Sequence, residues 1–388
     1  MMKRATKVRL YPTTEQEAFL NAQFGAVRFA YNKALHISRH RYQRHSVSVS
    51  IKRDLKPLLA VGKRSRRYSW LKEYDSLALQ QAVINLDTAF GHFFKRRARF
   101  PAFKRKQGKQ SSYHPNGKVL TDAIQLPKMA PIKAIIHRGI IGKVSSITVN
   151  RGTTGKYYAA ILCDDGLAAP AKPALITSVT GCDLGLSHYL IQSNGEKTAN
   201  PRPLVRASRN LRRKQKSLSR KIKGSANRTK ACLLVAKCHE HVVNARADFQ
   251  HKLSRTLIDE SQAVIVETLK AANMMKNHRL ARHIADAPWS GFIMKLEYKA
   301  EQAGKHLVKI DQWFASSKNC HCCGYKMAEM PLNKRIWPCP ACGVVEHDRD
   351  INAAINIQRK GITDLQAAGL VVSAHGGQRK SVVQTVAA

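Results

Sequence analysis

Two pairs of cysteines constrain this chain more than any other feature of its sequence. Cys320 and Cys323 form one CxxC motif, Cys339 and Cys342 form a second, and 15 residues separate the two motifs. Each motif places two thiolates on one tight turn, and two such turns can close a tetrahedron around one zinc ion. Because four cysteine ligands fill the coordination shell, the sequence predicts a structural zinc ion in a zinc ribbon over residues 316–346.

The other cysteines do not form a disulfide framework. The chain has nine cysteines, an odd number, of which Cys163, Cys182, Cys232 and Cys238 are scattered. Cys322 lies beside the predicted ligands and could compete with them. Reactive or core cysteines without a metal are the weaker alternative to zinc, because the spacing of the two pairs is that of known zinc sites.

The charge of the chain predicts a polyanionic partner. Lys and Arg number 67 against 25 Asp and Glu, a net charge of +42, which is far more than solubility requires. Apolar residues make up 44% of the chain, enough for globular cores. Basic residues recur along most of the sequence instead of forming one amphipathic segment, so nucleic acid is favoured over a membrane surface. With no apolar stretch of about 18 residues and no secretory signal, we expect a cytoplasmic protein.

Hydrophobic periodicity divides the chain into helical, β-rich and α/β parts. Residues 3–11 predict a strand that ends at Pro12, and Thr14-x-x-Glu17 fits a capping box that opens a helix. A second helix is expected over 77–94, followed by short β-branched runs up to Asp165. The Ala/Pro-rich stretch 168–174 is the clearest linker, and strands then alternate with helices in the C-terminal half.

Three acidic residues stand where a catalytic site can form. Asp183 ends a predicted strand in the sequence GCDLG, Glu267 ends the strand AVIVE, and a third acid, Asp348 or Asp350, precedes an apolar helix in HDRDINAA. Open α/β sheets present catalytic groups at the carboxyl ends of their strands. Each acid alone is better explained as a helix cap or a surface charge. Three acids that converge, however, can hold two Mg²⁺ ions about 3.5 to 4 Å apart and cleave a phosphodiester.

Basic side chains crowd one predicted helix and one aromatic-rich segment. A solvated face is the usual explanation, but unrelieved like charge destabilises a helix by a few tenths of a kcal/mol per pair, so phosphate contact is favoured. The predicted contacts are Arg206, Arg209, Arg212, Arg213, Lys214, Lys216, Arg96 and Arg97. Phe90 and Phe93 are assigned to the core, and a solvated helix face is favoured over adenine contacts for Gln80 and Gln81.

Motifs along nearly the whole chain resemble the transposon-encoded TnpB (OrfB) family. In the C-terminal half they are GCDLG, VIVETLK, LEYKAEQAGK, SSKNCHCCG, CPACG and HDRDINAAINI, and in the N-terminal half RLYPTTEQ, RFAYNKAL, FGHFFKRRARFPAFK and GKYYAAILC. This family looks ancestral to the type V CRISPR effector nucleases. The resemblance implies an RNA-guided DNA endonuclease with a RuvC (RNase H-like) domain.

The resemblance also implies a role for each candidate acid. It makes Asp183 the first RuvC carboxylate, Glu267 the second and Asp350 the third, with Asp348 the less favoured choice for that position. These three residues would be catalytic and would hold Mg²⁺. The four paired cysteines match the zinc-binding insertion of the family between the second and third acids. Since all three acids are present, the chain is not expected to be a nuclease-dead derivative.

The expected fold is α/β, an RNase H-like RuvC domain with an inserted zinc ribbon, plus an N-terminal helical recognition unit and a small β-barrel-like wedge unit. The wedge is assigned to residues 1–12 and 99–170, the helical unit to 13–98 and the nuclease domain to 175–362. By resemblance, the N-terminal units read a short motif in duplex DNA and hold the guide RNA. The tail, 363–388, lacks a firm pattern and is expected to be disordered.

The leading hypothesis is an RNA-guided, Mg²⁺-dependent DNA endonuclease of a transposon, in which base pairing supplies the sequence specificity. Its expected partners are a guide RNA, the double-stranded DNA target and the displaced single strand. One alternative is a DNA transposase that performs strand transfer with the same carboxylates and no guide, and the acids cannot separate the two. A non-catalytic, zinc-containing DNA-binding repressor is the other alternative, against which the three acids argue.

Overall fold

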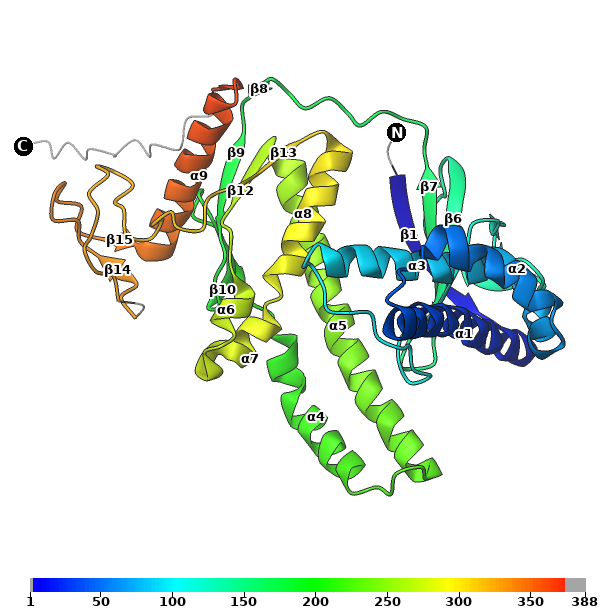
Figure 1. Cartoon of the computed structure of the whole chain (residues 1–388). Helices are drawn as coiled ribbons and strands as arrows, with labels where there is room; N and C mark the ends of the chain where they lie inside the picture. The colour runs from blue at the N-terminus through cyan, green and yellow to red at the C-terminus, as the bar shows by residue number, and fades with distance from the viewer. Residues whose placement is uncertain (1–2, 332, 374–388) are drawn as a thin grey trace, which may run out of the picture. The chain divides into compact units, whose positions relative to one another are not determined.

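The chain folds into two compact units, which we describe separately. The computed structural model describes residues 3–331 and 333–373, and the chain divides into residues 1–168 and 169–388 (Figure 1). The division falls at the start of the Ala/Pro-rich stretch 168–174. Among the helices of the described residues, none has a stretch long and apolar enough to cross a membrane.

A seven-stranded antiparallel sheet forms the β-rich part of the first unit. Its strands are β1 (Lys3–Tyr11), β2 (Gln110–His114), β3 (Lys118–Val119), β4 (Ala123–Gln125), β5 (Ile132–Ile135), β6 (Lys143–Arg151) and β7 (Tyr157–Asp164), in the order β2-β6-β7-β1-β5-β4-β3. β1 therefore pairs with strands that follow residue 99 in the sequence. Within the described residues no ladder joins the edge strands β2 and β3, but β3 lies against β6, so the sheet is curled without being closed by hydrogen bonds.

Helices make up the rest of the first unit. They are α1 (Thr14–His45), a π-helical turn (Ile51–Leu55), α2 (Lys56–Arg64), a 3₁₀ segment (Arg66–Glu73) and α3 (Ser76–Phe94). The predicted capping box lies one residue earlier than expected. Thr13, extended directly after Pro12, accepts a hydrogen bond from the Gln16 N–H, and the Gln16 side chain accepts one from the Thr13 N–H.

A five-stranded sheet is the centre of the second unit. Its strands are β9 (Val179–Asp183), β10 (His188–Gln192), β11 (Lys197–Ala199), β12 (Ala263–Val266) and β13 (His306–Lys309), in the order β11-β10-β9-β12-β13. β9, β12 and β13 run parallel, so their carboxyl ends lie at the same edge. The remaining short strands pair as β8 (Leu175–Ile176) with β16 (Val371–Val372) and β14 (Ile336–Trp337) with β15 (His347–Asp348).

Helices cover both faces of this sheet (Figure 1). The helices of this unit are α4 (Pro203–Ser219), α5 (Ala226–Glu260), α6 (Ala271–Met274), α7 (His278–Asp286), α8 (Trp289–Ala303) and α9 (Arg349–Ala367), of which α5 and α8 cover one face of the sheet and α9 the other. Val264 and Val266 of β12 face a core that includes residues of α5 and α8, whereas Ala263 and Ile265 face a core with α9. Alternation along a strand places successive side chains on opposite faces, so a strand covered on both sides is apolar throughout.

Two glycines allow α9 to lie directly on the sheet. A Cβ at Gly181 of β9 would lie 2.3 Å from the carbonyl oxygen of Ala354, and one at Gly361 of α9 would lie 2.3 Å from Cγ2 of Ile265. Any larger residue would push the helix away from the strands at either point. The close approach therefore sets where the N-terminus of α9 lies over the sheet.

The prediction of a disordered tail from residue 363 is wrong at its start. Residues 363–367 continue α9, because Leu365 packs into the core between this helix and the sheet. Val371 and Val372 then form a parallel strand with Leu175 and Ile176. Residues 374–388 of the predicted tail lie outside the described residues.

Candidate functional site

The four predicted zinc ligands come together in the structure. The Sγ atoms of Cys320, Cys323, Cys339 and Cys342 all lie within 4.8 Å of one another. Sγ of Cys320 is 3.7 Å from that of Cys342, and Sγ of Cys323 is 3.6 Å from that of Cys339. A tetrahedral zinc ion with Zn–S bonds of about 2.3 Å separates its sulfurs by about 3.8 Å. The four thiols therefore already have the spacing that such an ion requires.

The two CxxC motifs form turns of the same kind. The N–H of Gly324 donates to the carbonyl of Cys320 over 2.9 Å, and the N–H of Gly343 donates to that of Cys339 over 3.2 Å. Both glycines have positive φ, 78° and 70°, with open space around the missing Cβ. Backbone conformation, and not crowding, thus favours glycine at each turn. Burial raises the pKa of Cys339, but the N–H groups of Cys342 and Ala341 outweigh it and lower the pKa to about 7.

A buried histidine supports the cysteine cluster. Nε2 of His347 lies 3.2 Å from Sγ of Cys320, and its ring lies 4.8 Å from the ring of the buried Trp337. Cys320, Cys322 and His347 form a second group whose ligand atoms lie within 4.8 Å. This group shares Cys320 with the four-cysteine cluster. Burial and then the nearby His321 lower the pKa of His347, so a neutral His347 can donate a hydrogen bond to Sγ of Cys320.

Parallel strands bring the first two acids side by side. Asp183 ends β9, and Glu267 follows β12 directly; the register pairs Val266 with Cys182, which places the two acids next to each other at the same edge. The N–H of Leu184 donates to Oε1 of Glu267 over 3.0 Å. The residue after the first acid therefore orients the second.

Helix α9 brings the third acid to the same edge. Ala354 lies against Gly181, and Nε2 of Gln358 donates to the carbonyl of Val179 over 2.7 Å, so the helix runs antiparallel to β9. Asp350 lies one turn before Ala354 on the same helix face, which places it toward the end of β9 where Asp183 stands. Its negative charge acts on the pKa of Asp183, as does that of Glu267.

The three acids interact electrostatically. Burial, then the charges of Glu267 and Asp350, raises the pKa of Asp183 well above its usual value. Burial raises the pKa of Glu267 to about 7, although the hydrogen bond from Leu184 opposes this shift. Buried carboxylates that repel one another are expensive unless protons or metal ions neutralise them.

Two basic side chains separate the roles of the neighbouring acids Asp348 and Asp350. Asp348 is the N-cap of α9 and accepts hydrogen bonds from the N–H groups of Asp350 and Ile351 at 3.0 and 3.1 Å. It also pairs with Lys197. Nη1 of Arg335, by contrast, lies 2.9 and 3.1 Å from the carboxylate oxygens of Asp350. Burial would raise the pKa of Asp348, but Lys197 and the two N–H groups lower it, so this carboxylate serves as a cap.

The structure adds residues that the sequence did not single out. Oδ1 of Asn352 accepts from the N–H of His321 at 2.9 Å, and its Nδ2 donates to the carbonyl of Asn319 at 2.7 Å. Asn356 donates to the same carbonyl at 2.6 Å and to that of Ser316 at 2.8 Å. The two asparagines, four residues apart in INAAIN, fix the cysteine cluster to α9. That spacing is a usable signal, since it puts both amides on one helix face.

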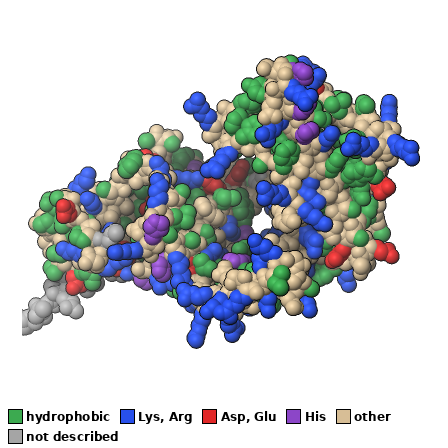
Figure 2. Space-filling model, turned by 60° about the horizontal axis from the view of Figure 1, so that its bottom comes forward, with side chains coloured by type: hydrophobic (Ala, Val, Ile, Leu, Met, Phe, Trp, Pro, Cys, Tyr) green, Lys and Arg blue, Asp and Glu red, His purple; other side chains and the backbone are tan. Residues whose placement is uncertain are grey.

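The predicted phosphate-binding side chains lie on the surface. Arg206, Arg209, Arg212, Arg213, Lys216, Arg96 and Arg97 are exposed, and Lys214 is half-buried against Sγ of Cys238. In the part of the chain that the structure describes, no ion pair joins any of these eight residues to an acid. Figure 2 shows Lys and Arg over the visible face with few acids among them.

A buried aspartate anchors the basic helix α4. Asp286 accepts from the N–H groups of Leu204 and Val205, both at 2.9 Å, and from Nη2 of Arg246 at 2.8 Å. It therefore caps the helix N-terminus while it binds α5. Of the predicted core aromatics, Phe90 packs against the helical core of the first unit, and Phe93 is half-buried beside Phe94 and Phe100.

Comparisons with known proteins agree with this arrangement. Residues 164–278 match an OrfB family model described as "Probable transposase", and residues 289–357 match one described as "Cas12f1-like, TNB domain". A protein of Streptomyces pristinaespiralis named "Putative RNA-guided DNA endonuclease" is 39% identical over 97% of this chain and 91% of its own length. The chain belongs to the TnpB (OrfB) family.

Other relatives come from a second bacterium and from a virus. The Escherichia coli K12 protein named "Putative RNA-guided DNA endonuclease InsQ" is 28% identical over 96% of both chains. A TnpB-like protein of Acanthamoeba polyphaga mimivirus is 26% identical over 47% of this chain and 37% of its own. A Cas12f1 chain in a complex with sgRNA and target DNA has the same fold, with a TM-score of 0.55 and 12% identity over 92% of this chain and 98% of that one.

One further match concerns the first unit of this TnpB-family chain. Residues 1–46 match a model described as "Helix-turn-helix domain". In the structure, the described part of this segment holds the strand β1 and the single long helix α1, which continues to His45. A second helix is absent from residues 3–46, so this segment does not itself contain the two helices of that motif.

Proposed function

We propose that the chain is an RNA-guided DNA endonuclease that hydrolyses phosphodiester bonds at Asp183, Glu267 and Asp350. The observation that carries the proposal is the convergence of these acids at one edge of a parallel sheet, in a chain whose similarity to the Streptomyces relative is nearly full length. The strand order β11-β10-β9-β12-β13, in which only β10 runs opposite to the other strands, supports an RNase H-like RuvC domain. Transposon mobility would be the biological context of the cleavage.

The three carboxylates suit Mg²⁺. They offer hard oxygen ligands, and the raised pKa values of Asp183 and Glu267 reflect negative charge that a divalent cation would neutralise. When bound there, Mg²⁺ activates the attacking water and stabilises the leaving oxygen. The chain contributes orientation: Leu184 holds one oxygen of Glu267, and the contact of α9 with Gly181 holds Asp350 at the strand ends. Arg335 must release Asp350 before that carboxylate can bind a cation.

We assign a structural zinc ion to the four cysteines. Their spacing fits a tetrahedral ion, and all four ligand positions would be filled, so no open position remains for water or substrate. Asn352 and Asn356 connect this cluster to α9, the helix that carries Asp350. By ordering residues 316–346, the zinc ion would therefore help to hold α9, and with it Asp350, in position. We propose that these residues form a zinc ribbon.

We propose that the basic surfaces bind the phosphates of RNA and DNA. The exposed arginines of α4 have no acidic partners among the described residues, and the net charge of +42 requires many phosphates for neutralisation. A guide RNA and the DNA strands of the target supply such phosphates. Because base pairing then provides the sequence specificity, the protein needs to recognise only the A-form backbone and a short flanking motif.

The test measures cleavage of a plasmid by the full chain. The protein is expressed from its gene either with or without the flanking DNA and then purified. RNA that copurifies is sequenced, and cleavage in Mg²⁺ is compared for a guide that matches the plasmid and a scrambled guide. We expect cleavage only with the matched guide and none with Asp183→Ala. Equal cleavage with the scrambled guide, or site-specific cleavage by RNA-free protein, would favour the guide-free transposase instead.

A further inference from the structure

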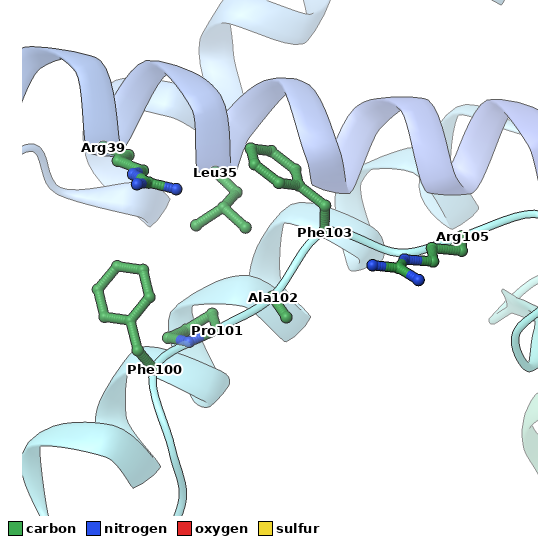
Figure 3. A pocket seen from close by; sticks show the side chains of 7 residues that line it. All are labelled: Leu35, Arg39, Phe100, Pro101, Ala102, Phe103 and Arg105. Carbon is green, nitrogen blue, oxygen red and sulfur yellow. The ribbon is translucent and has the colours of Figure 1, made fainter.

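A cavity in the first unit lies outside the features used above. Its volume is about 560 Å³, which is within the range of small-molecule sites. It lies between α1 and the chain segment that follows α3 (Figure 3). Its principal lining residues are Leu35, Arg39, Phe100, Pro101, Phe103 and Arg105. We call it the Phe100–Phe103 pocket.

The wall that carries the two phenylalanines is held against α1. The side chain of Asn32 donates to the carbonyl of Lys104 over 2.9 Å and accepts from the Lys104 N–H over 2.8 Å. Nζ of Lys104 lies 4.0 Å from the ring centre of Tyr31, also on α1. Pro101 further restricts the backbone between the two phenylalanines. The pocket is therefore preformed, and little ordering entropy opposes binding.

The aromatic rings of the pocket are accessible. Phe100 is 48% and Phe103 is 46% exposed, whereas Phe24 of the same unit is fully buried. The ring of Phe100 is nearly perpendicular to those of Phe90 and Phe93, at 5.5 and 5.3 Å between ring centres. Contacts of this kind fix the ring plane without covering both faces. An exposed, fixed aromatic face is the surface on which a nucleobase stacks.

The surroundings of the pocket are basic. Residues 88–121 contain nine Lys and Arg and no Asp or Glu, and α1 has no acid after Glu17. Arg39 and Arg105 stand at the two sides of the pocket, one on α1 and one on the following segment (Figure 3). Apolar walls with guanidinium groups at the rim match a base with the phosphates on either side of it.

We propose that the Phe100–Phe103 pocket binds an unpaired nucleotide of the guide RNA, with the base stacked on the phenylalanines and the adjacent phosphates paired with Arg39 and Arg105. This inference rests on the proposed function, which supplies the RNA. RNA loops and bulges present bases that are free to stack on aromatic side chains. The guide is also the partner that stays bound between cleavage events, so it can cover an apolar pocket that would otherwise stay exposed.

The test measures the affinity of the full chain, freed of RNA, for the RNA that copurifies with it. The double variant Phe100→Leu/Phe103→Leu keeps apolar volume and removes the rings. We expect it to weaken RNA binding roughly 5- to 150-fold, the effect of one lost base stack. Phe100→Tyr/Phe103→Tyr keeps the rings and should bind like wild type. Arg39→Gln and Arg105→Gln should each lower the salt dependence, by roughly 0.7 in the slope of log K against log salt.

Phe94→Leu is the matched control. Phe94 is 74% exposed in the same basic segment but does not line the pocket, so this variant should keep wild-type affinity. If the double leucine variant binds RNA like wild type, or Phe94→Leu loses as much affinity, the pocket is not the site. If only the affinity of the RNA-loaded chain for single-stranded DNA falls, the occupant is the displaced strand and the RNA assignment is wrong. A wild-type chain that copurifies with no RNA would instead overturn the proposed function itself.

Discussion

Replacement of Gly181 by alanine tests whether the contact between α9 and β9 positions Asp350. The new Cβ would lie 2.3 Å from the carbonyl oxygen of Ala354 and 2.6 Å from the backbone nitrogen of Gln358. These are backbone atoms of a helix and cannot rotate away, so α9 must move by about 1 Å to restore ordinary contact distances. Asp350 moves with its helix. Misplacement of a catalytic group by about 1 Å costs on the order of 100-fold in rate.

The assay is single-turnover cleavage of a matched target at saturating Mg²⁺, with RNA affinity measured in parallel. We expect Gly181→Ala to cleave about 100-fold more slowly and to bind RNA like wild type, because the basic surfaces do not depend on this contact. Overpacking should also lower the free energy of unfolding by about 1 to 3 kcal/mol. Gly291→Ala is the control, since its Cβ would lie 3.4 Å from its nearest neighbour, Oε1 of Gln250, which is an ordinary contact distance.

Two outcomes would refute this reasoning. A folded Gly181→Ala variant that cleaves at the wild-type rate would show that the register of α9 on β9 does not position Asp350. A loss of cleavage that is matched by Gly291→Ala would show that the unit tolerates no added methyl group, so the contact would have no special role.

The remaining predictions concern the metal sites. Asp350→Ala should abolish cleavage and leave RNA and DNA binding unchanged. Asp348→Ala should retain cleavage but melt at a lower temperature, because it loses about 1 kcal/mol of capping energy. The reverse pattern would mean that Asp348 is the third ligand. Cys339→Ser should lower the zinc content measured by metal analysis, and unchanged zinc would remove the assignment. Because the pKa of Glu267 is raised to about 7, the melting temperature of the metal-free protein should fall as the pH rises toward 7. Mg²⁺ should restore the melting temperature. If Mg²⁺ leaves the melting temperature unchanged as the pH rises toward 7, the proposed site is contradicted. Cleavage at limiting Mg²⁺ should correspondingly fall below about pH 7, where Glu267 takes up a proton. Arg335→Gln should reduce the Mg²⁺ concentration for half-maximal cleavage, since the arginine competes for Asp350, and an unchanged midpoint would show that it does not.

The sequence by itself determined the features that depend on short stretches of chain. The two CxxC motifs with their glycines define two turns, and the structure brings those four sulfurs together. Helices such as α3 and strands such as β1 and β12 follow from local periodicity, which is why their positions could be predicted closely. The capping box was displaced by one residue, because Thr13 and Thr14 are chemically equal and only the extended backbone after Pro12 decides between them.

Only the tertiary structure decided how distant residues combine. More than 80 residues separate Asp183 from Glu267, and Glu267 from Asp350. The parallel register of β9 with β12 and the contact of α9 with Gly181 bring the three acids to one edge of the sheet. That Asp348 caps α9 while Asp350 pairs with Arg335 likewise became visible only in the geometry of that helix. Convergence of this kind depends on pairing and packing between elements far apart in the chain, which local periodicity does not encode.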